Sequence, residues 1–332
     1  MGAQISNISI YLPKKIVTNT DLEKEFESWS AEKIEDKTGI RERHVTAPDE
    51  TALDLAIAAC ENLFKNYDKD KVDFILLCTQ SPEYFLPTTA CLLQDRLGLK
   101  KQIVALDFNL GCSGFIYGLS LAKGLIAGGI ANNILLVTSE TYTKFIHKKD
   151  KGNRTIFGDG AAAVMIEKCT SEKIFNFVLG TDGSGYKNLI IPNGGLRSPF
   201  NADALEVVDE NQNITSDNHL FMNGPEIFNF TIENIPGLVK EILIKNNLSE
   251  EDVDYYIFHQ ANKFMLNYLR KKIKIPENKF FINILNTGNT VSATIPIALH
   301  ECLKNDLVKK GNKVVLVGFG VGYSWGATVI EI

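Results

Sequence analysis

The chain has 332 residues, 45% of them hydrophobic, and a formal net charge of −5. This length predicts one large core or two fused halves, and the acidic balance argues against a nucleic-acid partner. No apolar segment is long enough to cross a bilayer, and the first residues, MGAQISNISIYLP, have neither the basic start nor the long apolar core of a signal peptide. We therefore expect a cytoplasmic protein that binds no membrane. The six scattered cysteines fit a reducing compartment and predict neither disulfides nor a metal site.

The first half of the chain alternates between strand-like and helix-like segments. We expect strands over 4–11, 72–78, 103–106, 133–139 and 164–167, and helices beginning near Thr20 and spanning 51–65, 88–97 and 115–126. Residues 37–44 are rich in cations and are predicted to form a loop. That loop could be a solvated turn or a phosphate-binding edge.

The second half repeats this plan. The strand-like run at 253–259 matches 72–78, the run at 280–284 matches 103–106, and the run at 313–317 matches 133–137. Two copies of one β-α-β-α-β unit are the simplest explanation, with halves 1–170 and 171–332. Strands that alternate with helices predict an α/β protein with parallel sheets covered on both faces. Residues 183–220 lack periodicity and are predicted to cross the surface as a long irregular segment.

The sequence around Cys112, DFNLGCSGFIYG over 107–118, predicts a strand, a tight turn that carries one thiol, and a helix. The partial positive charge of a helix N-terminus favours a thiolate, so we expect a lowered pKa and a nucleophilic sulfur. Most cysteines are instead small buried apolar residues, and the turn alone does not decide between the two interpretations.

Two further turns follow predicted strands of the second half. His259 ends the 253–259 run, and Asn289 lies in a glycine turn whose position in the repeat nearly matches that of Cys112. Pseudo-symmetry would bring the two matching turns together at the centre of the molecule. A thiolate that accepts an acyl group, with imidazole and amide N–H groups that stabilise an oxyanion, suits acyl-thioester chemistry.

The chain resembles the β-ketoacyl-acyl-carrier-protein synthase III family of the thiolase superfamily. The matching segments occur in family order: Thr-Gly-Ile-Arg-Glu-Arg-His at 38–44, Gly-Cys-Ser-Gly at 111–114, Phe-Gly-Asp-Gly at 157–160, His-Gln-Ala-Asn at 259–262, Gly-Asn-Thr at 288–290 and the glycine-rich segment 318–327. The resemblance implies a five-layered α-β-α-β-α thiolase-like fold with two pseudo-symmetric halves, and a homodimer.

The reaction that the resemblance implies is a decarboxylative Claisen condensation. An acyl-CoA loads its acyl group onto Cys112, malonyl-acyl-carrier-protein loses CO2, and the enolate, stabilised by His259 and Asn289, attacks the acyl thioester. Backbone N–H groups of Cys112 and Val321 would form the oxyanion hole. Acyl-CoA is a substrate in this scheme, and no cofactor is expected.

The resemblance also points to binding residues. Contacts to CoA or to the carrier protein are expected from Lys33, Arg41, Lys151, Arg154, Asn262 and Lys263, and an acyl pocket is expected from Leu86, Phe115 and Phe157.

Several of these positions depart from the family pattern. Lys33 stands where a tryptophan usually stacks on the CoA adenine, with Trp29 one helical turn earlier, and Phe264 replaces a basic carrier-docking residue. Val321 occupies a position where glycine is common, and Leu86 replaces the larger phenylalanine that often closes the acyl pocket across the dimer. Together the departures predict a specialised synthase of a dedicated pathway that accepts acyl groups longer than acetyl.

Other functions remain open at this point. The enzyme could pass the Cys112-bound acyl group to an amine, a hydroxyl or another acceptor without decarboxylation, although the presence of both His259 and Asn289 favours condensation. A catalytically silent partner subunit would generally lack the cysteine. A thiolase proper would carry a second cysteine near the C-terminus, which 318–327 lacks.

Overall fold

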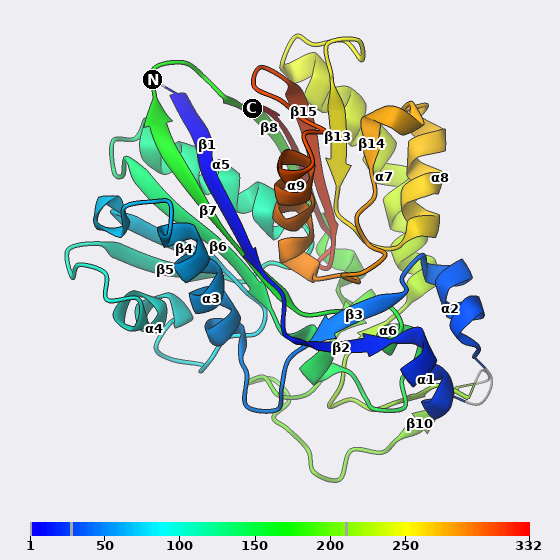
Figure 1. Ribbon diagram of the computed structural model, residues 1–332. Helices are drawn as coiled ribbons and strands as arrows, with labels where there is room; N and C mark the ends of the chain where they lie inside the picture. Colours follow the sequence, from blue (N-terminus) through cyan, green and yellow to red (C-terminus); the bar gives the residue numbers. More distant parts are fainter. Residues whose placement is uncertain (1, 27–28, 210–211) are drawn as a thin grey trace.

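The computed structural model describes residues 2–26, 29–209 and 212–332. The first half of the described chain forms a five-stranded sheet of order β1-β7-β6-β4-β5 (Figure 1). Its strands are β1 (Gly2–Tyr11), β4 (Phe74–Cys78), β5 (Val104–Phe108), β6 (Asn133–Glu140) and β7 (Gly160–Cys169). Strands β4 and β6 are buried along nearly their whole length, and their apolar side chains, all of β4 and 134–137 of β6, are as expected for interior strands.

The second half forms another five-stranded sheet, of order β8-β16-β15-β13-β14. Its strands are β8 (Ile174–Thr181), β13 (Tyr255–Phe258), β14 (Phe280–Phe281), β15 (Lys313–Gly320) and β16 (Ser324–Glu331). Each strand occupies the place of its counterpart in the first sheet, so the internal repeat predicted from the sequence appears as a repeated topology.

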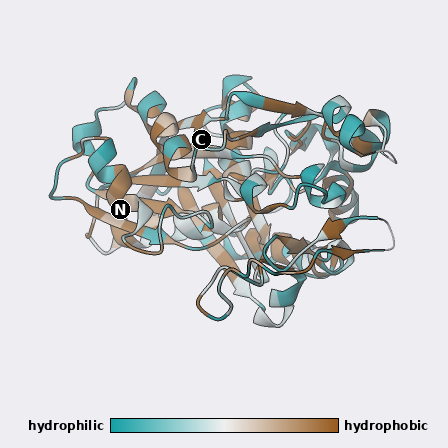
Figure 2. Ribbon diagram, turned by 90° about the horizontal axis from the view of Figure 1, so that it is seen from below, coloured by the Kyte–Doolittle hydropathy of each residue, from teal (hydrophilic) through white to brown (hydrophobic). Residues whose placement is uncertain are grey.

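Helices fill the space between the sheets and cover their outer faces (Figure 1). Helices α5 (Gly114–Ala127) and α9 (Thr294–Lys304) pack between the sheets, α3 (Ala52–Phe64) and α4 (Thr89–Arg96) cover the first sheet, and α7 (Gly224–Lys245) and α8 (Lys263–Ile273) cover the second. The prediction of a five-layered α-β-α-β-α fold is confirmed. Figure 2 shows hydrophobic residues along the central strands and hydrophilic residues on the outer helices.

The prediction of parallel sheets is only partly right. Strand β4 pairs in parallel with β5 and β6, but β7 runs antiparallel to β6 and β1 runs antiparallel to β7. The parallel strands are those joined by the packed helices α4 and α5. Strands β15 and β16 are separated by only three residues, and such a short connection can join only antiparallel neighbours.

The predicted loop over 37–44 is a helix end followed by a strand. Helix α2 (Ala31–Thr38) ends at Gly39, whose φ of 72° suits a residue without a side chain, and β3 (Glu42–Val45) pairs with β2 (Lys15–Thr18). Arg43 is buried and donates to carbonyl oxygens of Val17 and Thr155, which is why this charged segment is not simply a solvated turn.

The remaining elements have seven residues or fewer. They are α1 (Asn19–Glu25), η1 (Lys69–Lys71), η2 (Tyr142–Phe145), α6 (Lys151–Arg154), η3 (Gly183–Asn188), β9 (Leu189–Ile190), β10 (Val207–Val208), β11 (Ile214–Thr215), β12 (Phe221–Met222), η4 (Glu277–Lys279) and η5 (Val291–Ala293). Within the predicted irregular segment at 183–220, the described residues thus form one short helix and brief strands.

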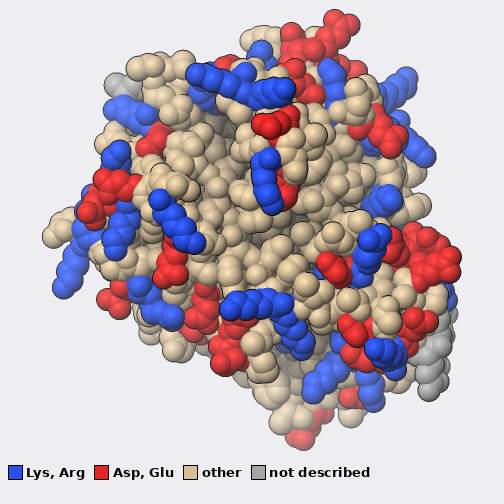
Figure 3. All heavy atoms as spheres, viewed as in Figure 1, with Lys and Arg blue, Asp and Glu red and all other residues tan. Residues whose placement is uncertain are grey.

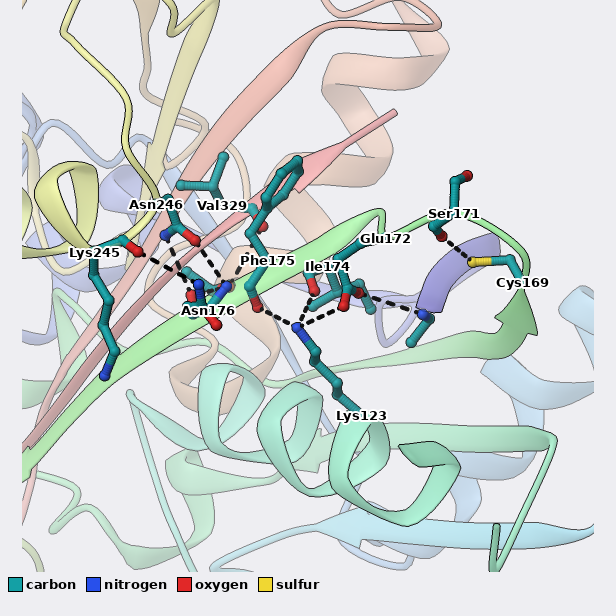
Figure 4. Close-up of polar contacts among 12 residues, drawn as sticks. Lys123, Cys169, Ser171, Glu172, Ile174, Phe175, Asn176, Lys245, Asn246 and Val329 are labelled. Atoms are coloured by element: carbon teal, nitrogen blue, oxygen red, sulfur yellow. Dashed lines mark hydrogen bonds and ion pairs between the residues drawn. The ribbon is translucent and has the colours of Figure 1, made fainter. Parts of the chain in front are cut away.

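Polar contacts fix the chain where it passes from the first sheet to the second (Figure 4). The Lys123 ammonium of α5 donates to the carbonyl oxygens of Ile174 at 2.6 Å and Phe175 at 2.9 Å. The Asn176 N–H donates to the side chain of Asn246, at the end of α7, at 2.9 Å. The connection is therefore tied to one helix of the central layer and one of the outer layer.

No helix among the described residues combines the length and apolar character that a membrane span requires. Basic and acidic side chains are interspersed over the face seen in Figure 3, where no continuous basic band is visible.

Candidate active site

Cys112 lies in the tight turn between β5 and α5, one residue before the N-cap Ser113. Its side chain is only 6% exposed. Gly320, at the end of β15, lies so close that a Cβ there would be 2.8 Å from the Cys112 sulfur. The loop after β15 therefore covers the nucleophile, and the predicted strand-turn-helix arrangement is present.

The expected lowering of the Cys112 pKa is not what the structure gives. Burial raises the pKa of the thiol to about 12, while hydrogen bonds from the backbone N–H groups of Val321 and Cys112 itself act in the opposite direction. The sequence revealed the helix N-terminus but not the loss of solvent around the sulfur. The resting residue is consequently a neutral thiol. The two N–H groups point toward its sulfur, where they would stabilise a negative charge.

His259 follows β13 and is 2% exposed. Burial lowers its pKa to about 3, so the imidazole is neutral near pH 7. Its Nδ1 lies 2.7 Å from Oγ1 of Thr294, and that hydroxyl also lies 3.0 Å from the carbonyl oxygen of Val291. The hydroxyl has one hydrogen and can donate it to either partner. If it donates to Val291 O, the imidazole proton is on Nδ1 and Nε2 has a free lone pair. If it donates to Nδ1, the imidazole proton is on Nε2, and Nε2–H can donate a hydrogen bond.

Asn289 is held by its backbone and by its side chain. Its N–H donates to Ile156 O at 2.9 Å, and its own carbonyl oxygen accepts from Gly158 N–H at 3.0 Å. Its Oδ1 accepts from Val291 N–H at 2.9 Å. Because the amide oxygen is occupied, Nδ2 is the group of this side chain that is left to donate a hydrogen bond.

These three side chains line one cavity of about 130 Å³. Its lining residues are Cys112, Ile156, Phe157, Leu189, Met222, Gly224, Ile227, His259, Ala261, Asn262, Met265, Asn289, Phe319 and Gly320. The wall is mostly apolar, and its polar side chains are the thiol, the imidazole and the amides of Asn262 and Asn289. Such a cavity can accept an acyl thioester and place hydrogen-bond donors at its carbonyl oxygen.

The three residues predicted for the acyl pocket are placed differently. Phe157 lines the cavity, and the centre of its ring lies 5.4 Å from the centre of the Tyr142 ring. Phe115 does not line this cavity: it is fully buried in the core around α5, because it lies on the side of the helix that packs between the sheets. Leu86 is 81% exposed and does not reach the cavity of its own chain, so its predicted role across a dimer stays a prediction.

The residues predicted to bind CoA fall into separate places. Lys33 and Lys151 line a surface cavity of about 410 Å³ together with Trp29, Lys37 and others. The ammonium groups of Lys33 and Lys37 lie 5.7 Å and 4.9 Å from the centre of the Trp29 ring. Among the described residues, this cavity combines an aromatic face with three lysines and one carboxylate, that of Asp209, and its cations exceed its anions, which suits a nucleotide phosphate and base.

Arg41 and Arg154 lie outside that cavity and have acidic partners. Arg41 donates to both carboxylate oxygens of Glu35, at 3.2 Å and 3.3 Å, and Arg154 forms an ion pair with Glu25. Each arginine thus has an acidic partner within the chain, and its contact with CoA phosphates stays a prediction.

Asn262 and Lys263 begin helix α8. Asn262 lines the cavity of Cys112, but its Oδ1 caps α8 by accepting from Met265 N–H at 2.8 Å. Lys263 lies at a surface cavity beside Phe264 and Tyr268, and its side chain packs against Gly39. The two residues therefore face different parts of the surface around α8.

The sequence did not single out much of the cavity wall. Leu189 and Met222 come from the two-residue strands β9 and β12, which pair with each other, and Ile227 and Met265 come from α7 and α8. Strands of two residues leave no periodic signal, and apolar residues on amphipathic helices look like ordinary core. Lys37 belongs to the cation-rich segment 37–44 but was not among the predicted binding residues.

Among the described residues, no group of three or more His, Cys, Asp or Glu side chains is arranged to hold a metal ion.

Comparisons with known proteins identify the family of the chain. Two family models match, 3-oxoacyl-[acyl-carrier-protein] synthase III over 106–183 and its C-terminal domain over 243–332. The chain is 39% identical to β-ketoacyl-[acyl-carrier-protein] synthase III of Clostridium perfringens, covering 100% of this chain and 99% of that protein.

Solved structures show the same relationship. A crystal structure of a 3-oxoacyl-(acyl-carrier-protein) synthase III superposes with a TM-score of 0.99 at 47% identity, covering both chains completely. One from Burkholderia xenovorans has a TM-score of 0.92 at 35% identity, covering 100% of this chain and 94% of that one. Fold and site define a thiolase-like protein with a Cys-His-Asn centre. The chain belongs to the β-ketoacyl-acyl-carrier-protein synthase III family.

Proposed function

We propose that the protein condenses an acyl-CoA with malonyl-acyl-carrier-protein through an acyl group on Cys112. The observation that carries this proposal is the convergence of Cys112, His259 and Asn289 on one largely apolar cavity. A thiol alone would serve many transfers. The imidazole and the amide beside it are the additional groups that an enolate requires.

In the first step the Cys112 sulfur attacks the acyl-CoA carbonyl. The N–H groups of Cys112 and Val321 hold the oxyanion, the bond from carbon to the CoA sulfur breaks, and CoA leaves as a thiol with the proton that Cys112 gives up. Burial lowers the pKa of His259 to about 3, so this imidazole is a poor acceptor for that proton, and the proton passes to the CoA sulfur as the thiol attacks. Little thiolate exists beforehand, because burial raises the pKa of the Cys112 thiol.

In the second step the malonyl group loses CO2. The electron pair of the broken bond moves onto the thioester oxygen, which accepts hydrogen bonds from Asn289 Nδ2 and His259 Nε2–H. The enolate carbon then attacks the acyl carbonyl, the bond to Cys112 breaks, and the sulfur leaves as a thiolate that takes up one proton. The thioester itself stabilises the carbanion, so the proposed reaction needs no cofactor.

CoA binding is assigned to the cavity of Trp29, Lys33, Lys37 and Lys151, from which the pantetheine arm would enter the cavity of Cys112. Asn262 lines the cavity of Cys112 and is proposed to contact the pantetheine arm, and Lys263 beside Phe264 is proposed to contact a carrier protein. Arg41 and Arg154 form ion pairs with Glu35 and Glu25, and contacts from them to CoA remain part of the proposal.

Residues 1–170 and 171–332 form the two halves of this proposal, and a homodimer is its expected assembly. Strand β5 is the edge of the first sheet and exposes Val104 and Leu106, and Phe85 and Leu86 are more than four-fifths exposed. Exposed apolar residues beside an open strand edge favour pairing with a second copy. A cytoplasmic location is proposed with it, supported by six free cysteines.

Intact-protein mass spectrometry with a panel of acyl-CoAs tests the proposal. An adduct that forms on the wild type but not on Cys112→Ala, and that malonyl-acyl-carrier-protein removes with release of a β-ketoacyl product, is expected. An adduct that malonyl-acyl-carrier-protein leaves intact, but that an amine or hydroxyl acceptor removes, would instead favour transfer without decarboxylation. The chain length that loads best would also test the expectation of groups longer than acetyl.

A further inference from the structure

Glu140 is a fully buried carboxyl group that connects the two halves beside the active site. It ends β6, and its oxygens accept from Gln80 N–H at 3.0 Å and from the Ser81 hydroxyl at 3.2 Å, both just beyond β4. From the second half, the hydroxyl of Ser292 donates to it at 2.7 Å. Ser292 thus links the carboxyl group to the turn that carries Asn289.

That turn, residues 289–294, orients both polar residues of the proposed second step. Val291 N–H holds the Asn289 amide oxygen, and Val291 O accepts from Thr294, whose hydroxyl contacts His259. Val291 has a φ of 56°, a left-handed conformation that is costly for a β-branched residue. Such a conformation persists only when its surroundings enforce it.

We propose that Glu140 is a positioning residue for condensation, which holds turn 289–294 in the strained conformation that aims Asn289 and His259 into the cavity. The inference rests on the proposed function and deepens it. The carboxyl group is anchored on the first half by Gln80 and Ser81, so Ser292 transmits a fixed position to the turn. The groups that serve Cys112 acylation as oxyanion donors, the N–H groups of Cys112 and Val321, lie on other segments and do not depend on this link.

Ser292→Ala separates this role from general stability. The variant removes the hydroxyl that reaches Glu140 and does not alter the side chains of Asn289, His259 and Cys112. We expect the rate of Cys112 acylation to stay within about twofold of the wild type. The rate at which acylated enzyme releases CO2 from malonyl-acyl-carrier-protein should fall about tenfold, at unchanged KM, because angstrom-scale displacement of a catalytic group is costly.

Ser139→Ala is the matched control. Ser139 precedes Glu140 in β6, is equally buried and donates one hydrogen bond, to Ala52 O at 2.6 Å, away from the turn. It should lose comparable stability without changing either rate. Glu140→Gln keeps a carbonyl oxygen that can accept from Ser292, so CO2 release is expected to stay within about threefold of the wild type.

The rates distinguish the outcomes. A loss of CO2 release with intact acylation in Ser292→Ala alone supports the proposal. Equal losses of acylation and CO2 release in this variant, or losses shared by Ser139→Ala, would reduce Glu140 to a structural group and overturn it, as would no loss at all. If the wild type itself forms no Cys112 adduct, the proposed function fails first, and that failure is visible before any variant is compared.

Discussion

Gly320 lies so close to Cys112 that an alanine at this position would collide with the nucleophile. A Cβ there would stand 2.7 Å from the Cys112 Cβ and 2.8 Å from its sulfur. Carbon atoms pack best at about 3.5–4.0 Å, so the thiol would have to move by roughly 1 Å. A displacement of about that size can lower a rate ~100-fold, while the crowding itself costs about 1–3 kcal/mol of stability.

Gly320→Ala is therefore expected to slow Cys112 acylation about 100-fold while the protein stays folded. Stopped acylation reactions, read by mass spectrometry, give the rate, and circular dichroism checks the fold. Gly237→Ala is the control, because a Cβ at that helical position meets no atom within 4 Å. Acylation of Gly320→Ala at the wild-type rate would refute the argument that Gly320 leaves room for the thiol.

Three further predictions concern charge. Lys37→Gln should raise KM for acyl-CoA several-fold at low salt and less at high salt, with kcat unchanged, since exposed charges are screened; steady-state kinetics at two ionic strengths measure this. Burial raises the pKa of the Glu140 carboxyl group to about 8. Above the ordinary pKa of a glutamate and below about pH 8, this group is therefore protonated in the folded protein and ionised in the unfolded chain. Between pH 5 and 8 the free energy of unfolding of the wild type should fall relative to that of Glu140→Gln by up to about 1.4 kcal/mol per pH unit. Urea unfolding measures both free energies, and the same pH dependence in both proteins would contradict this prediction. Because the pKa of His259 is lowered to about 3, CO2 release by acylated enzyme should be flat from pH 5.5 to about 7.5, and a midpoint near the ordinary histidine pKa would contradict this.

The repeated topology could be predicted because buried strands leave long apolar runs. The runs at 72–78 and 253–259 became the central strands β4 and β13, with the same neighbours in both sheets. Strand direction was harder to predict, because it depends on whether a packed helix intervenes between two strands. Strand β3 was missed, since its buried Arg43 finds oxygen partners that are distant in sequence.

The meeting of Cys112 and Asn289 could be predicted from the repeat, because matching turns meet where two related halves face each other, and His259 follows β13, the strand that pairs with β14 ahead of Asn289. The electrostatics could not, since the direction of the Cys112 pKa depends on burial that no local motif reveals. Glu140 was missed for the same reason. Its donors come from 80, 81 and 292, and only the folded chain brings them together.

The most direct test of the account is a single turnover of enzyme acylated on Cys112 with malonyl-acyl-carrier-protein, in which CO2 and β-ketoacyl product are counted together. The account predicts one CO2 and one product for each acyl group lost from Cys112, and Asn289→Ala should keep its adduct with little release of either. Loss of the acyl group without CO2, or product formed equally well by Asn289→Ala, would contradict condensation at this site.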